Sequence, residues 1–105
     1  MPAIANAIAE RELVWVKPDG ERVPITLRIG KPYRTRGDDW ACPVAAEGFQ
    51  TRLADMHGID SFQALMLAQG LLAKLMVGAV EDGGHFLNVD DDTPVDVNRL
   101  FEAGI

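Results

Sequence analysis

The residues of this chain best suited to chemistry are one cysteine and two histidines. Cys42 is the only thiol, and His57 and His85 are the only imidazoles. A cysteine nucleophile needs a neighbouring base or a positive field to become a thiolate. The chain contains the residues for one Cys–His pair. Cys42, however, falls in the middle of an expected strand among small residues, which is typical of a buried structural cysteine. The sequence therefore predicts no catalytic residue.

A metal site is the next possibility for the histidines. His57 precedes and His85 follows a long expected helix, which places them about 35 Å apart at about 1.5 Å per residue. The acidic run Asp90, Asp91 and Asp92 lacks the alternation and glycine of a calcium loop, and no pair of ligands has zinc spacing. Gly83 and Gly84 follow a helix, whereas phosphate-binding loops precede one. We expect neither a metal nor a cofactor.

Charge is unevenly distributed along the chain. Residues 1–36 hold seven Lys or Arg and four acids, and the remaining residues hold three and twelve, for a net charge of −6. One polar loop combines an aromatic residue with cations: Lys31, Tyr33, Arg34 and Arg36. This loop could contact an anion or an acidic partner. Alternatively, it only keeps the chain soluble and balances Asp38 and Asp39.

The acidic surplus gathers around and after the helix end, at Glu81, Asp82, Asp90, Asp91, Asp92 and Asp96. Such a surface could cover a basic partner, as an immunity or antitoxin protein does, and the association would be faster at low salt. A solvated acidic turn is the plainer interpretation. The negative net charge argues against nucleic-acid binding, which needs a basic surplus.

The element that organises these residues is a helix within residues 58–84. Asp60 is its expected N-cap, with Gln63 at the capping-box position, and the helix should end near Glu81–Asp82, before two glycines. Apolar residues surround it almost completely, so it must be covered on more than one side. Polar interruptions argue against a membrane span. We expect a core helix whose outer face is covered by terminal segments or by a second copy of the chain.

Alternation and turn residues predict five strands, at residues 12–17, 23–29, 40–45, 49–56 and 85–89. The sequence Pro18-Asp19-Gly20 predicts a tight hairpin turn, and Pro24 predicts an unpaired or edge position in the second strand. Residues 30–39 should form a loop. Residues 1–9 could be a short helix or an extended lead-in.

A short helix should close the chain. Thr93 and Pro94 are its expected N-cap and first residue, Val97, Leu100 and Phe101 its apolar side, and its end lies near Ala103.

Together these elements predict one α+β domain of 105 residues with two layers. An antiparallel sheet of four to five strands carries the long helix on the face with Val23, Ile25, Leu27 and Ile29, and its other face, with Thr26, Arg28 and Arg52, is more polar. A single cysteine requires no oxidising compartment, and no signal-peptide pattern opens the chain, so we expect a cytoplasmic protein.

Two segments carry a resemblance to a known family. I-G-K-P-Y at Ile29–Tyr33 precedes the cysteine strand, and G-I-D-S-F-Q-A-L at Gly58–Leu65 opens the helix. In this order of elements, over about residues 10–90, the chain resembles a family of small bacterial proteins of unknown function. The resemblance implies an α+β fold and a bacterial cytoplasmic setting, and it brings no activity or catalytic residue.

Three functional hypotheses follow from these observations. The first is a non-enzymatic interaction module that forms a homodimer, because the helix has surplus apolar surface and the chain lacks a catalytic constellation. The second is an acidic immunity or antitoxin-type protein that neutralises a basic partner. The third is a small-ligand binder or enzyme that uses Cys42 or the Lys31–Arg36 loop.

Overall fold

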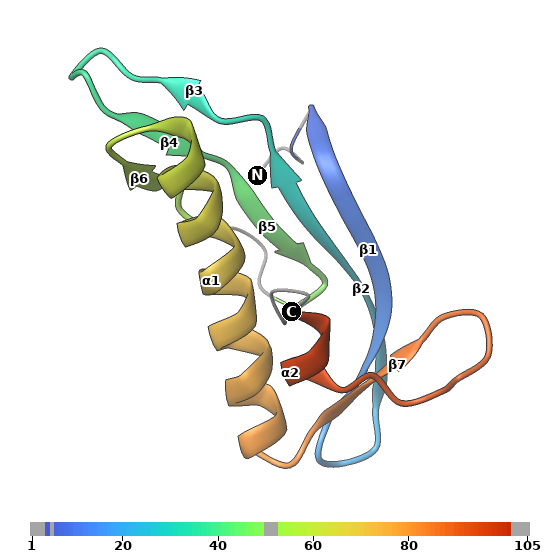
Figure 1. The fold of residues 1–105 in the computed structure, drawn as a ribbon. Helices are drawn as coiled ribbons and strands as arrows, with labels where there is room; N and C mark the ends of the chain where they lie inside the picture. Colours follow the sequence, from blue (N-terminus) through green and yellow to red (C-terminus); the bar gives the residue numbers. More distant parts are fainter. Residues whose placement is uncertain (1–3, 5, 50–52, 102–105) are drawn as a thin grey trace.

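A computed structural model describes residue 4, residues 6–49 and residues 53–101. The elements in these residues are β1 (Ala7–Val16), β2 (Arg22–Gly30), β3 (Tyr33–Arg34), β4 (Trp40–Cys42), β5 (Val44–Glu47), β6 (Met56–Gly58), α1 (Ser61–Glu81), β7 (His85–Asn88) and α2 (Val97–Leu100). Figure 1 shows α1 lying along one side of the strands, with α2 beside it. The predicted α+β class, with one long helix on a sheet and a short terminal helix, is confirmed.

The strands divide into two antiparallel sheets, which the sequence analysis did not foresee. One has the order β5-β2-β1-β7 and the other β3-β4-β6. The predicted strand over residues 40–45 is broken at Pro43, where the chain passes from the second sheet to the first. Proline has no N–H to donate to a ladder. Its carbonyl still accepts from Gly30 N at 2.9 Å, which holds the break against the end of β2.

The β1–β2 hairpin agrees with its predicted turn. Gly20 has φ +91° and donates its N–H to Lys17 O at 2.8 Å. β1 begins at Ala7, so the last residues of the lead-in are extended rather than helical. β5 pairs with β2 only from Thr26 to Ile29, and among the described residues no strand pairs with Pro24 on that side, as predicted.

Two strand assignments were wrong. The predicted loop over residues 30–39 contains β3, which pairs with β4 around a turn where Asp38 has φ +73°. The predicted strand over residues 49–56 is absent from the described part of that range except for Met56. Phe49 instead lies in a turn, and its ring packs edge-on against Trp15 with centroids 4.5 Å apart. Aromatic packing in the core replaces the ladder that alternation suggested.

The terminal helix begins later than predicted. Pro94 forms an antiparallel bridge with Leu87, so residues 93–95 extend along β7. Asp96, not Thr93, is the N-cap, and its carboxylate accepts from Asn98 N and Arg99 N. The predicted helix end at Ala103 lies outside the described residues.

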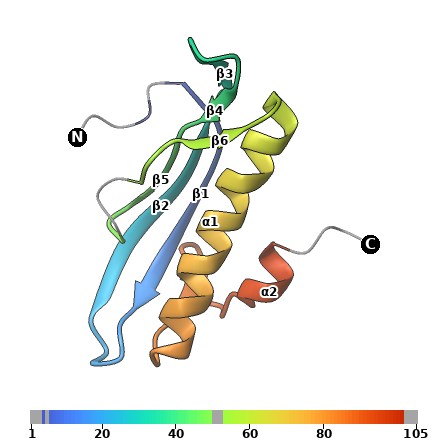
Figure 2. The same cartoon turned by 90° about the vertical axis from the view of Figure 1, so that its left-hand side faces the viewer.

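The core lies between α1 and the sheets. Ile25 and Leu27 are buried on the helix side of β2, as predicted, whereas Val23 and Ile29 are half-buried. On the other side, Arg28 forms ion pairs with Glu10 at 3.2 Å and Glu47 at 3.1 Å. Arg52, also predicted for this polar side, lies outside the described residues. Figure 2 shows the sheets and α1 as two layers.

Candidate functional site

The two faces of α1 differ sharply in exposure. The buried positions recur at helical spacing: Ala64, Ala68, Leu72, Met76 and Ala79. Large apolar residues are exposed on the opposite side and on its flanks, Phe62 at 72 % and Met66 at 47 %. We define the outer face of α1 as Phe62, Met66, Leu67, Gly70, Lys74 and Val80, all exposed. Exposed apolar side chains on one helix face are the kind of surface at which interaction sites form, so the outer face of α1 is the candidate site.

Both ends of α1 are closed as the sequence predicted. Asp60 Oδ1 accepts from Gln63 N at 2.7 Å, and Gln63 Oε1 accepts from Ile59 N at 2.7 Å. At the other end Gly83, with φ +100°, and Gly84 donate to two carbonyls of the last turn, in the pattern of a Schellman motif. The helix is therefore fixed in length by its own caps.

The start of α1 packs closely against β6 on its inner side, whereas Ile59 just before the helix is exposed. A Cβ added to Gly58 would lie 2.6 Å from Ala64 N, so β6 approaches the helix as closely as backbone allows. Ile59 is the residue before the N-cap, and an apolar residue at that position often packs back onto the first turns of its helix. Here it is 78 % exposed. Ile59 therefore extends the outer face of α1 instead of stapling the helix start.

The middle of the outer face is open. A Cβ added to Gly70 on the outer face, or to half-buried Gly78 on its flank, would meet nothing within 4 Å. α2 packs near one flank of α1, with Val97 buried and Leu100 half-buried. The prediction that terminal segments could cover the outer face is therefore not met by the described residues.

By length and composition alone, α1 could also cross a membrane. The core helix of a soluble protein passes the same test, and the inner face of α1 is packed against the sheets. Spanning a bilayer would require this face to leave the core.

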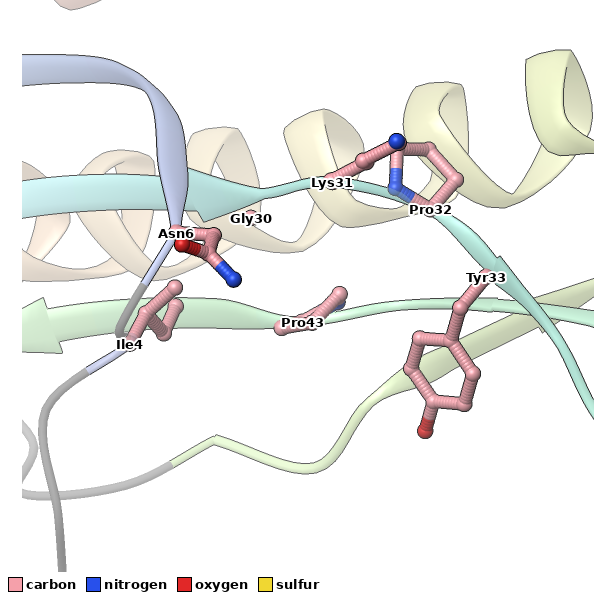
Figure 3. Close-up of a pocket in the computed structure, with 7 residues that line it drawn as sticks. All are labelled: Ile4, Asn6, Gly30, Lys31, Pro32, Tyr33 and Pro43. Carbon is pink, nitrogen blue, oxygen red and sulfur yellow. The ribbon is translucent and has the colours of Figure 1, made fainter.

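The residues of the predicted basic loop have different surroundings in the structure. Tyr33 OH donates to Asp55, and Arg34 pairs with Asp38 at 3.3 Å. Lys31 and Arg36 are exposed. Lys31, Pro32 and Tyr33 line a shallow hollow of about 560 Å³ together with Ile4, Asn6, Gly30 and Pro43 (Figure 3). Its walls are mainly apolar, and Lys31 is the only cation of the loop among them, so the hollow does not gather the cations of the loop around one ligand.

Sequence analysis did not foresee a polar cluster beside this loop. Asp39 accepts from Thr35 Oγ1, and its other oxygen lies 2.8 Å from His57 Nδ1. These two hydrogen bonds, that of Thr35 first, lower the pKa of Asp39. The hydrogen bond to Asp55 is the main cause of a raised pKa for Tyr33. The cluster joins β6 to the β3–β4 turn. Predicting it would have required knowing that β4 pairs with β6.

Cys42 behaves as the buried residue that the sequence predicted. It is fully buried, and its Sγ lies 3.4 Å from Gly30 O. Burial raises the pKa of this thiol, which opposes thiolate formation. His57 pairs with Asp39 rather than with Cys42. Among the described residues, no group of three His, Cys, Asp or Glu side chains is placed to hold a metal.

The predicted acidic residues separate into several places. Asp82 is the C-cap of α1, and Asp96 the N-cap of α2. Asp92 pairs with Arg22 at 2.7 Å, and Asp91 accepts from Thr93, which lowers the pKa of Asp91. Asp90 and Asp91 line a hollow that also includes Glu10 and Glu12 of β1. The acidic run thus meets β1 at a point that sequence spacing did not indicate.

Comparison with known proteins gives one match. A family model described as a domain of unknown function (DUF6968) matches residues 9–96. No curated protein and no solved structure matches the chain. The match spans most of the described elements, from β1 to the N-cap of α2. The chain belongs to this family.

Proposed function

We propose that this member of the DUF6968 family is a non-catalytic interaction protein that self-associates through the outer face of α1. The observation that carries the proposal is the exposure of Phe62 at 72 % beside exposed Met66 and Leu67 on a capped, ordered helix. Leaving apolar area in water costs about 25 cal/mol per Å² relative to burial. A second copy of the same helix is the simplest cover.

Residue sizes along the outer face favour an antiparallel pair of helices. Gly70 lies near the middle of Ser61–Glu81. A two-fold axis at Gly70 sets Phe62 of one copy level with Gly78 of the other along the helix, and Met66 level with Lys74. Gly70 of one copy faces Gly70 of the other at the axis, where an added Cβ would find open space, so the two helices can approach closely. A two-fold interface is self-complementary by symmetry, so each of these contacts occurs twice.

Lys74 is compatible with this arrangement. Its aliphatic stem can lie along Met66 of the other copy while the ammonium stays in water. A helix of this length is about 31 Å long and about 10 Å wide, so one face of it covers about 300 Å². A stable interface buries roughly 800 Å² per partner, so the contact through this face alone is small. Ile59 enlarges the contact at each end. We therefore expect a dissociation constant in the micromolar range.

Sedimentation velocity across the micromolar range tests the proposal. The wild-type chain should pass from monomer to dimer, and Phe62→Asp should remain monomeric because the dimer would bury two new charges. Val89→Asp is the matched control, since Val89 is exposed at 50 % but lies outside the outer face of α1. Val89→Asp should dimerise like the wild type.

Three results would contradict the proposal. The first is a wild-type monomer at every concentration, and the second is equal loss of dimer in both variants. The third is binding of the monomeric wild type, but not of Phe62→Asp, to phosphatidylcholine vesicles, which would make the outer face a lipid-binding surface. Circular dichroism should show the same helix content in all three proteins.

A further inference from the structure

A second surface, separate from the outer face of α1, lies at the edge of the larger sheet. β7 pairs with β1 only from Leu13 to Val16. Among the described residues, no strand pairs with the segment Ala7–Glu12 on that side, and we call this segment the free edge of β1. In Figure 1 this part of β1, in blue, runs along the side of the sheet. An antiparallel ladder directs alternate backbone groups to opposite neighbours, so half of those on the free edge have no strand to meet.

An apolar groove opens beside the free edge. It holds about 350 Å³ and lies between β1, β2 and both helices. Its walls include Ala9, Arg11, Leu27, Leu65, Leu72 and Phe101. Arg11 lies opposite buried Leu27 in the β1–β2 register, so Ala9 and Arg11 are on the helix side of the sheet. A residue added opposite Ala9 would therefore direct its side chain towards the groove.

Acidic residues occupy the other side of the same edge. Glu10 and Glu12 alternate with Ala9 and Arg11, and they point away from the helices. Asp90 and Asp91 join them around a hollow of about 400 Å³ where β7 ends. Arg11, the cation in this hollow, donates to Asn88 Oδ1 at 3.0 Å. On this side Arg28 already pairs with Glu10 at 3.2 Å, whereas Glu12 and Asp90 form no ion pair among the described residues, so the exposed side of the edge favours a further cation beside Glu12 and Asp90.

We propose that the free edge of β1 binds an extended segment of a basic protein partner in which lysine or arginine alternates with apolar residues. The segment adds a strand to the sheet, with its apolar side chains in the groove and its cations beside Glu12 and Asp90. Main-chain hydrogen bonds supply affinity, and the two side-chain rows supply specificity. Antiparallel pairing of two copies centred on Glu10 or Arg11 would set like charges opposite, so a second copy fits less well.

Fluorescence anisotropy with a labelled peptide, Lys-Val-Lys-Leu-Lys-Val, tests this site. The peptide should bind, and a peptide of the same composition with its lysines in one block should not. Glu12→Lys should weaken binding about fivefold to tenfold, because it reverses one cross-strand charge pair. Glu21→Lys, which makes the same charge change in the β1–β2 turn, should leave binding unchanged. Ala9→Arg should weaken binding by blocking the groove.

Amide chemical shifts of the ¹⁵N-labelled protein locate the peptide independently of affinity. Residues 7–12 should shift, and a peptide N-methylated at alternate residues should lose this effect. Phe62→Asp should bind the peptide as the wild type does, so failure of the dimer and failure of this site are distinguishable. Equal binding of the block or N-methylated peptide, equal loss in Glu12→Lys and Glu21→Lys, or no binding at millimolar peptide would overturn the proposal.

Discussion

The inner and outer faces of α1 are built from similar residues that meet different surroundings. Met76 on the inner face is 1 % exposed, and Met66 on the outer face is 47 % exposed. The inner face also uses small residues, Ala64 and Ala68, where β4 and β6 come close. Hydrophobicity alone therefore does not reveal which face the chain buries, whereas small residues at helical spacing mark the side of closest approach. The outer face retains large side chains because no described segment of this chain presses against it.

The largest expected difference between the faces comes from truncating the two methionines. Met76→Ala should lower the free energy of unfolding by about 2 to 5 kcal/mol, because it leaves a cavity in the core. Met66→Ala should change it by no more than about 0.5 kcal/mol in the monomer. Urea unfolding at protein concentrations below dimerisation measures both values. Equal losses would show that the outer face is buried within one chain.

The next prediction concerns Gly58 of β6, which contacts the inner side of α1 at its start. Gly58→Ala should cost about 1 to 3 kcal/mol, since the new Cβ would lie 2.6 Å from Ala64 N and neither backbone can move freely. Thermal unfolding followed by circular dichroism gives the shift. An unchanged melting temperature would mean that β6 and α1 are less tightly packed than this contact indicates.

Gly70 on the outer side should respond in the opposite direction. Gly70→Gln should raise monomer stability by about 0.5 to 1 kcal/mol, because glycine is a poor helix former and its Cβ position is open. The same substitution should weaken self-association by keeping two helices apart at the proposed axis. Unfolding of dilute protein and sedimentation of concentrated protein measure the two effects. A more stable monomer that still dimerises fully would place the axis elsewhere.

The smallest expected effect lies outside both faces of α1 and concerns the hydrogen bond between Tyr33 and Asp55. Tyr33 is the only tyrosine, and its hydrogen bond to Asp55 raises its pKa above 10.0. A raised phenol pKa stabilises the folded state below pH 10, and this contribution is lost as the pH rises through the folded-state pKa. Asp55→Asn should move the Tyr33 pKa towards 10.0 in an ultraviolet titration. No movement would mean that the two side chains are not bonded in solution.

Local patterns predicted much of this fold. The caps of α1 and the turn at Gly20 were predictable because each depends on residues within a few positions of one another. The α+β class followed from one long helix among alternating strands. The errors came where tertiary contacts decide: Pro43 divides one apolar run between two sheets, and Phe49 joins the core through Trp15 instead of continuing a strand.

The candidate surfaces were predictable only in part. The apolar surplus of α1 was evident from composition, but which side is exposed depends on the sheets beneath it. Burial of Cys42 followed from its small neighbours. The meeting of Glu12 with Asp90, and of Asp39 with His57, depends on strand register between distant segments, which no single sequence displays.

Disulfide formation at the proposed axis tests self-association through the outer face of α1 most directly. Cys42→Ala removes the native thiol, and Gly70→Cys or Arg36→Cys then supplies a single exposed one. Two cysteines can join when their Cα atoms are about 4.4 to 6.8 Å apart, as expected at a close helix crossing. Under mild oxidation at micromolar concentration, the Gly70→Cys protein should become a covalent dimer and the Arg36→Cys protein should not. Equal cross-linking of both, or of neither, would contradict the account.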